Sequence, residues 1–130
     1  MFDHVSITVS DLERSRAFYA AALAPLGIRE IMQFEQCVGF GVQRPQFWLM
    51  AGDAVQPSPR THIAFQATNR LEVDTFHRTA IAAGGSDNGA PGVRPHYHDN
   101  YYGAFVLDPD GHNVEAVCHR PPSSPPKDAS

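Results

Sequence analysis

The sequence predicts an α+β fold made of two βαβββ modules, each consisting of a strand, a helix and three further strands. One observation behind this is an internal repeat with an offset of 58 residues (62 − 4 = 58). At this offset three residues recur in order, His4, Phe18 and Gly27 as His62, Phe76 and Gly85. The other observation is that each half passes from a strand-like alternation to a helical pattern and then to short apolar runs.

The first module begins with a half-buried strand at residues 5–9, where valine and isoleucine alternate with polar neighbours. Ser10 and Asp11 offer N-cap oxygens for the following helix, and Glu13 lies three residues after Ser10, as in a capping box. The segment 25–27, Pro-Leu-Gly, ends this helix. Three strands are then expected, at Ile28–Phe34, Val38–Val42 and Phe47–Met50.

The second module repeats this pattern. Asn69 takes the capping position, and the pair Gly84-Gly85 ends the helix. The apolar helical face consists of Phe76, Ala80 and Ile81. Its three strands are expected near Val93, at Tyr101–Leu107 and at Val114–Val117.

Composition indicates one globular domain. The 130 residues suffice for a single core, so we expect a domain at 1–120, with module 1 at 1–56, module 2 at 57–120 and a flexible Pro/Ser-rich tail at 121–130. The net charge of −4, without a basic cluster, argues against nucleic acid as a partner. No apolar run approaches the roughly 20 residues of a membrane span, and no secretory signal is visible. We interpret Cys37 and Cys118 as free thiols in a reducing cytosol, which predicts a cytoplasmic protein.

The most specific local signal is the segment LDPDGHNVEAV at residues 107–117. Its Asp108–Gly111 part has the chemistry of a tight turn, because proline presets φ and glycine accepts positive φ. The turn joins two apolar runs and therefore predicts a hairpin. Glu115 then lies within an apolar strand, where its carboxylate either points to solvent or faces inward and needs a partner.

Three stretches resemble the vicinal oxygen chelate superfamily, which includes glyoxalase I, fosfomycin resistance proteins, extradiol dioxygenases and bleomycin resistance proteins. They are HVSITVSDLERSRAFYAAAL at the start, THIAF at the second histidine and FVLDPDGHNVEAV at the end, within residues 3 to 118. The resemblance implies that the paired modules form a curved mixed sheet around a metal-centred cavity. It also implies that the metal ligands come from the first and last strands of each module, where His4, His62 and Glu115 stand.

Two imidazoles and one carboxylate are a standard ligand set for a divalent metal, with open positions for substrate. The expected metal is Fe, Mn, Zn or Ni. The fourth ligand position of glyoxalase I-like members falls on Phe47–Met50, which offers no strong ligand. Trp48 and Met50 share one face of that strand and are expected to line the substrate cavity.

The stretch from Arg94 to Tyr102 is dense in groups that bind small polar or aromatic molecules. The alternative is a surface loop followed by ordinary aromatic packing. Arg94 is expected to hold a carboxylate or phosphate, and His96 or His98 to carry a proton near neutral pH. The expected substrate-binding set is completed by Tyr97, Tyr101 and Phe105.

Fosfomycin modification is not expected. In fosfomycin resistance proteins a tyrosine lies ten positions before the final glutamate, and here that position is Phe105. The threonine two residues after their first histidine corresponds to Ser6, which keeps a hydroxyl and is a further catalytic candidate. Their potassium-binding loop is not evident in this chain.

The predicted function is therefore a metal-dependent enzyme acting on a small molecule with chelating oxygens, of lyase, isomerase or dioxygenase type. The alternative is a metal-free protein that binds a drug or another small molecule, like the bleomycin resistance proteins; a partner that has kept only the fold is a third possibility. The resemblance also implies a homodimer, with cavities either within one chain or shared between two. The sequence does not decide the substrate or whether a thiol such as glutathione takes part.

Overall fold

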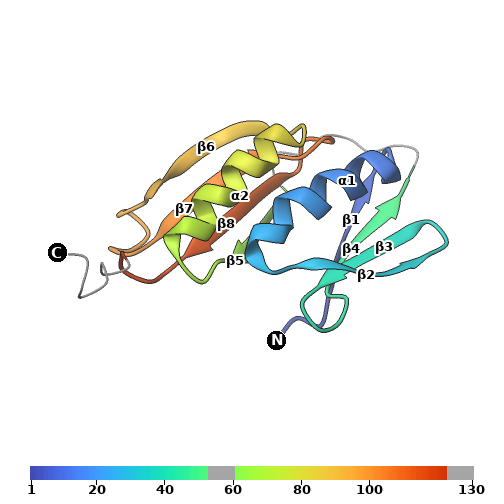
Figure 1. Cartoon of the computed structure of the whole chain (residues 1–130), viewed down its shortest axis with the longest axis horizontal. Helices are drawn as coiled ribbons and strands as arrows, with labels where there is room; N and C mark the ends of the chain where they lie inside the picture. The colour runs from blue at the N-terminus through green and yellow to red at the C-terminus, as the bar shows by residue number, and fades with distance from the viewer. Residues whose placement is uncertain (53–60, 123–130) are drawn as a thin grey trace, which may run out of the picture.

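The computed structural model describes residues 1–52 and 61–122, which form two four-stranded sheets, each with one helix (Figure 1). The first module contains β1 (Val5–Val9), α1 (Leu12–Leu23), the 3-10 turn η1 (Ala24–Leu26), β2 (Arg29–Phe34), β3 (Cys37–Gly41) and β4 (Phe47–Ala51). The second contains β5 (His62–Gln66), α2 (Arg70–Ala82), β6 (Ser86–Val93), β7 (Tyr102–Leu107) and β8 (Asn113–Cys118). The predicted α+β fold of two βαβββ modules is confirmed. The expected module boundary at residues 56–57 and most of the expected tail lie outside the described residues.

The strand order places the first and last strands of each module side by side. The orders are β1-β4-β3-β2 and β5-β8-β7-β6, and the β1–β4 and β5–β8 pairs are parallel. In the second sheet His62 is in register with Asn113, and Ala64 with Glu115. His62 and Glu115, which are 53 positions apart in the chain, therefore meet on neighbouring strands.

The helix starts agree only partly with the sequence prediction. Asp11 is the N-cap of α1, and its side chain accepts a hydrogen bond from the backbone N–H of Arg14. The expected capping box from Ser10 to Glu13 is wrong, because both the amide and the hydroxyl of Ser10 donate to the carboxylate of Asp110. In the second module Asn69 caps α2 as expected.

The glycine of the second module that is equivalent to Gly27 lies one residue earlier than the repeat predicts. Gly27 ends the first helical segment in the left-handed region, with φ 77°. Its counterpart in conformation is Gly84, with φ 107°, rather than Gly85. Gly85 serves packing instead, because an added Cβ would lie 2.5 Å from Val106 and 2.8 Å from Phe18.

One hydrophobic core spans both modules. Phe18 of α1 and Phe76 of α2, the repeat pair, are both buried in it. The two helices contact one another, and the rings of Phe47 and Phe65 meet across the modules at 5.1 Å. The strand residues that alternate with the core positions lie on the other side of each sheet. We call this side, which faces away from the helices, the open face.

The hairpin at Asp108–Gly111 forms as predicted and connects the modules. Asp108 is buried and accepts a hydrogen bond from the hydroxyl of Tyr19 on α1. His112 is also buried, and its Nε2 lies 2.9 Å from the carbonyl oxygen of Thr8 on β1. His112 is therefore a packed residue of the module junction, directly after the turn.

Within the described residues no helix combines the length and apolarity needed to cross a bilayer. Cys37 and Cys118 are free thiols, as expected. The cytoplasmic location stays a prediction.

Candidate functional site

His62 and Glu115 form the closest pairing of metal-ligating groups among the predicted site residues. Nε2 of His62 lies 2.7 Å from Oε1 of Glu115. The Glu115 side chain has 0% exposure, whereas that of His62 is 46% exposed. Glu115 alternates with Val114 and Ala116, which belong to the core, so its carboxylate points to the open face of the second sheet. The structure thus brings together a buried carboxylate and an accessible imidazole.

Tyr101 contacts the second oxygen of the same carboxylate. Its hydroxyl donates a hydrogen bond to Oε2 of Glu115. Between the two lies Gly103, where an added Cβ would stand 3.0 Å from that oxygen and 3.2 Å from the Tyr101 ring. Burial, and then the hydrogen bond to Glu115, raise the pKa of Tyr101 well above its ordinary value. Both carboxylate oxygens of Glu115 therefore have a partner in this structure.

His4, the third predicted ligand, belongs to the other sheet. It precedes β1 and is exposed, and its Nδ1 lies 2.7 Å from a carboxylate oxygen of Asp3. In the described parts of a single chain no three His, Cys, Asp or Glu side chains come together in a way that could hold a metal ion. One chain therefore places two of the three predicted ligands together, and the third on a separate sheet.

His4 lines a shallow hollow together with three residues that the sequence singles out, Ser6, Trp48 and Met50. A hollow of about 220 Å³ on the open face of the first sheet is lined by His4, Ser6, Phe34, Cys37, Trp48 and Met50. Trp48 and Met50 share this face, as the alternation in β4 predicts. Ser6 lines the same hollow as His4, on the first sheet, whereas the His62–Glu115 pair lies on the second sheet.

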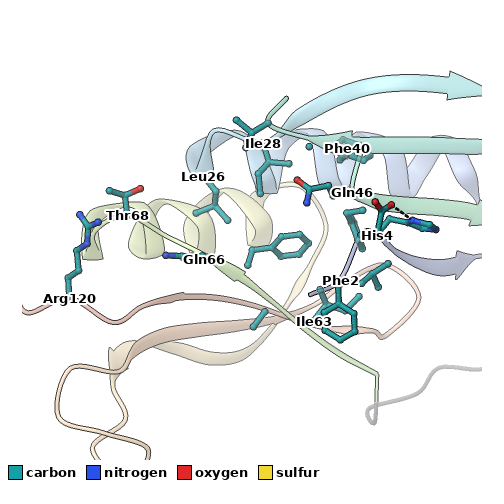
Figure 2. A pocket seen from close by; sticks show the side chains of 17 residues that line it. Phe2, His4, Leu26, Ile28, Phe40, Gln46, Ile63, Gln66, Thr68 and Arg120 are labelled. Atoms are coloured by element: carbon teal, nitrogen blue, oxygen red, sulfur yellow. Dashed lines mark hydrogen bonds and ion pairs between the residues drawn. The ribbon is translucent and has the colours of Figure 1, made fainter. Parts of the chain in front are cut away.

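A larger cavity of about 530 Å³ lies between the modules (Figure 2). Leu26 and Ile28 line it from the first module, and Ile63 and Thr68 from the second. Figure 2 places Arg120 beside Thr68 at one end and His4 at the other. Neither Glu115 nor Tyr101 is among the residues that line this cavity, so it is separate from the paired ligands.

Arg94 and Phe105 extend the site along the second sheet. The ring of Phe105 lies 5.9 Å from that of His62, and the Arg94 guanidinium lies 5.5 Å from the Phe105 ring. Nη2 of Arg94 donates to the carbonyl oxygen of Ala90. These contacts place an apolar ring next to His62, and a cation against that ring.

The histidines of the loop before β7 form a surface cluster. His98 Nε2 lies 2.6 Å from His119 Nδ1, and the ring of His96 packs 4.2 Å from that of Tyr97. Tyr101 links this cluster to Glu115, since its ring lies 4.7 Å from Tyr97 and 5.5 Å from His98. Of the two histidines predicted as proton carriers, His98 contacts the Tyr101 ring directly and His96 contacts it through Tyr97.

Three residues near the site have no clear signal in the sequence. Asp3 contacts His4, Gly103 leaves room beside Glu115, and His119 pairs with His98. Of these, only Gly103 could have been suspected, because a glycine inside an apolar strand often marks a close approach of neighbouring groups.

Comparison with known proteins identifies the family. A family model, that of the Glyoxalase/Bleomycin resistance protein/Dioxygenase superfamily, matches residues 1–116. The chain belongs to this superfamily. It is 30% identical over 133 residues to the uncharacterized protein YqjT of Bacillus subtilis, covering 88% of this chain and 96% of that protein.

Solved structures of the superfamily share the fold. A glyoxalase/bleomycin resistance protein from Albidiferax ferrireducens is 30% identical, with a TM-score of 0.83 over 91% of this chain and 98% of the other. The fosfomycin resistance protein FosX from Listeria monocytogenes is 24% identical, with a TM-score of 0.70 over 91% and 92%. A point mutant of that FosX, crystallised with Mn(II) and 1S,2S-dihydroxypropylphosphonic acid, has a TM-score of 0.69 at 24% identity, over 90% of this chain and 88% of the other.

Proposed function

We propose that this superfamily member is a metal-dependent enzyme acting on a small molecule, with a metal site formed by His62 and Glu115 of one chain and His4 of a second copy. The observation that carries this proposal is the His62–Glu115 pair. A carboxylate without exposed surface is costly to bury unless charged or hydrogen-bonding groups compensate it. An imidazole nitrogen at 2.7 Å supplies a second metal-binding atom on the same open face.

The donor set suits a divalent transition metal. Imidazole nitrogen and carboxylate oxygen are ligands of Fe, Mn, Zn and Ni, the metals expected from the sequence. The Mn(II) in the FosX complex supports Mn²⁺ as the first metal to try. When bound, the metal would supply Lewis-acid stabilisation of negative charge on a substrate oxygen.

The second copy is proposed because of what the open face of the first sheet carries. Met32, Phe34 and Met50 are exposed, and Phe34 and Met50 line the hollow that contains His4. Apolar side chains gathered on one face often mark a contact surface. A two-fold dimer that covers this face with the open face of a partner's second sheet would create two identical sites, each with both histidines and the carboxylate.

The remaining residues have roles that follow from their chemistry. Trp48 and Met50 would pack against the body of the substrate and exclude water. Arg94 would bind an anionic group on it. Ser6 would hydrogen-bond a substrate oxygen beside His4. The reaction would be of lyase, isomerase or dioxygenase type, depending on the metal.

The test is metal binding by chelator-treated protein, titrated with Mn²⁺ and with Zn²⁺. We expect saturable binding that weakens at least about a hundredfold in His62→Ala and in Glu115→Gln, because each removes a ligand. The double variant His98→Ala/His119→Ala is the matched control, because it removes an imidazole pair that can hold metal at the surface.

Absence of saturable binding in the wild type, or its complete loss in the control variant, would contradict the proposal. If the chelator-treated protein instead binds bleomycin with the same affinity in the presence and absence of metal, the function is metal-free drug binding.

A further inference from the structure

The hydroxyl of Tyr101 contacts one particular oxygen of Glu115. The sequence predicts that this tyrosine lines a substrate cavity, but its hydroxyl donates to Oε2 of Glu115. The other oxygen, Oε1, faces His62. The two oxygens of one carboxylate are thus assigned to different partners, one structural and one on the side where the proposed metal would bind.

The backbone is built to allow this contact. Gly103 and Phe105 of β7 lie on one face of the strand, and Phe105 is in register with Glu115, whereas Tyr101 directly precedes β7. To reach Glu115, the Tyr101 ring must pass over position 103. Glycine permits this, because any Cβ at this position would crowd both the ring and Oε2, at 3.2 and 3.0 Å.

The position of the Tyr101 ring is set by its neighbours. A tyrosine phenol is protonated at neutral pH, so its hydroxyl donates to the Glu115 carboxylate. Tyr97 packs against the Tyr101 ring at 4.7 Å and His119 at 5.3 Å, which restricts its rotation.

We infer that Tyr101 is a positioning residue for Glu115: it holds Oε2 over Gly103, so that Oε1, the oxygen that faces His62, is the one directed at the proposed metal. This inference rests on the proposed metal site and deepens it. Groups that hydrogen-bond a metal ligand fix its orientation, and their loss typically lowers metal affinity by about 10- to 100-fold.

The experiment compares chelator-treated wild type with Tyr101→Phe in Mn²⁺ and Zn²⁺ titrations. The phenylalanine keeps the ring and removes only the hydroxyl, so we expect affinity to fall about 10- to 100-fold. Infrared spectra of the metal-bound protein should show the carboxylate stretches of Glu115 changing from a one-oxygen to a two-oxygen binding pattern, because Oε2 is released.

Tyr102→Phe is the matched control. Tyr102 is the next residue, and its hydroxyl also donates to a carboxylate, Asp74 of α2, at 2.6 Å. Removing the Tyr102 hydroxyl breaks a hydrogen bond of the same type that does not involve Glu115, so metal affinity should stay within about twofold of the wild type.

Gly103→Ala is a second variant. It keeps the Tyr101 hydroxyl, but the added methyl group crowds the Tyr101 ring and Oε2 of Glu115. Like Tyr101→Phe, it should therefore lower metal affinity.

The outcomes separate the two claims. If the wild type binds neither metal, the proposed function fails, and the inference fails with it. If the wild type binds metal and Tyr101→Phe binds it equally, with unchanged infrared spectra, only the inference is overturned. An equal loss of affinity in Tyr102→Phe would overturn it too, because the effect would then follow from general destabilisation.

Discussion

At the scale of single residues, Glu115 is the most unusual feature of the chain. It is fully buried, yet it lies on the sheet face away from the core. Three neighbouring residues allow this burial. Tyr101 and His62 each contact one oxygen of the carboxylate, and Gly103 has no side chain that would crowd it. Strand alternation alone predicts only that Glu115 faces away from its neighbours in β8. The burial comes from side chains distant in sequence.

Two tyrosines, the buried Tyr19 and the partly buried Tyr102, predict how stability depends on pH. Burial, followed by the hydrogen bond to Asp74, raises the pKa of Tyr102 to about 12 from its ordinary 10.0. The pKa of Tyr19 is raised as well, mainly by burial. Because the folded pKa exceeds the unfolded one, this contribution to stability is complete below pH 10 and is lost as pH rises through the folded value.

The measurement is the midpoint of urea unfolding at several pH values between about 8 and 11. We expect the midpoint to fall above pH about 10, and to fall less steeply in Tyr102→Phe, which lacks the titrating group. Parallel pH profiles for the two proteins above that pH would show that Tyr102 does not make this contribution.

At the scale of elements, the hairpin between β7 and β8 does more than reverse the chain. Asp108 accepts hydrogen bonds from Tyr19 of α1 and from two backbone amides of its own turn. Asp110 binds Ser10, just before α1. The hairpin of the second module therefore fixes the start of the first helix, which connects the two halves through polar contacts as well as through the core.

This role predicts different costs for the two aspartates. Asp108→Ala leaves the Tyr19 hydroxyl and two amides without their acceptor in a buried place, so we expect a loss of about 3 kcal/mol in unfolding free energy. Asp110→Ala removes contacts at a partly exposed helix start, and should cost about 1 kcal/mol. Urea unfolding of both variants measures this, and equal costs would contradict the proposed role of the hairpin.

The elements are predictable from the sequence because their signals are local. Alternation in residues 5–9 and the glycines after each helix identify the units. The N-cap of α1 is only half predictable, because Ser10 and Asp11 are equally suitable by type and the choice depends on Asp110, 100 residues away. For the eight residues of β6 (Ser86–Val93) the sequence predicts only a strand near Val93, because this Gly-, Asp- and Pro-containing stretch lacks apolar alternation.

At the scale of the whole molecule, the arrangement of the two modules decides where the ligands lie. The repeat predicts that His4 and His62 occupy equivalent positions in the two modules. In the structure His4 directly precedes β1, and His62 is the first residue of β5. Equivalence does not imply proximity. In one chain the modules share their core through α1 and α2, and His4 remains with the first sheet. No local pattern in the sequence determines this packing.

The central claim is that the metal site is shared between two copies, and subunit mixing of His4→Ala with His62→Ala tests it most directly. Each variant alone lacks one ligand in every site and should bind no metal tightly. In a mixed dimer, one site combines the intact His4 of one chain with the intact His62 and Glu115 of the other. Random mixing should then restore about one metal per four chains, measured by metal analysis after removal of excess ion. Restored binding at that level supports the shared site. No recovery, although the chains have been shown to exchange, would contradict it.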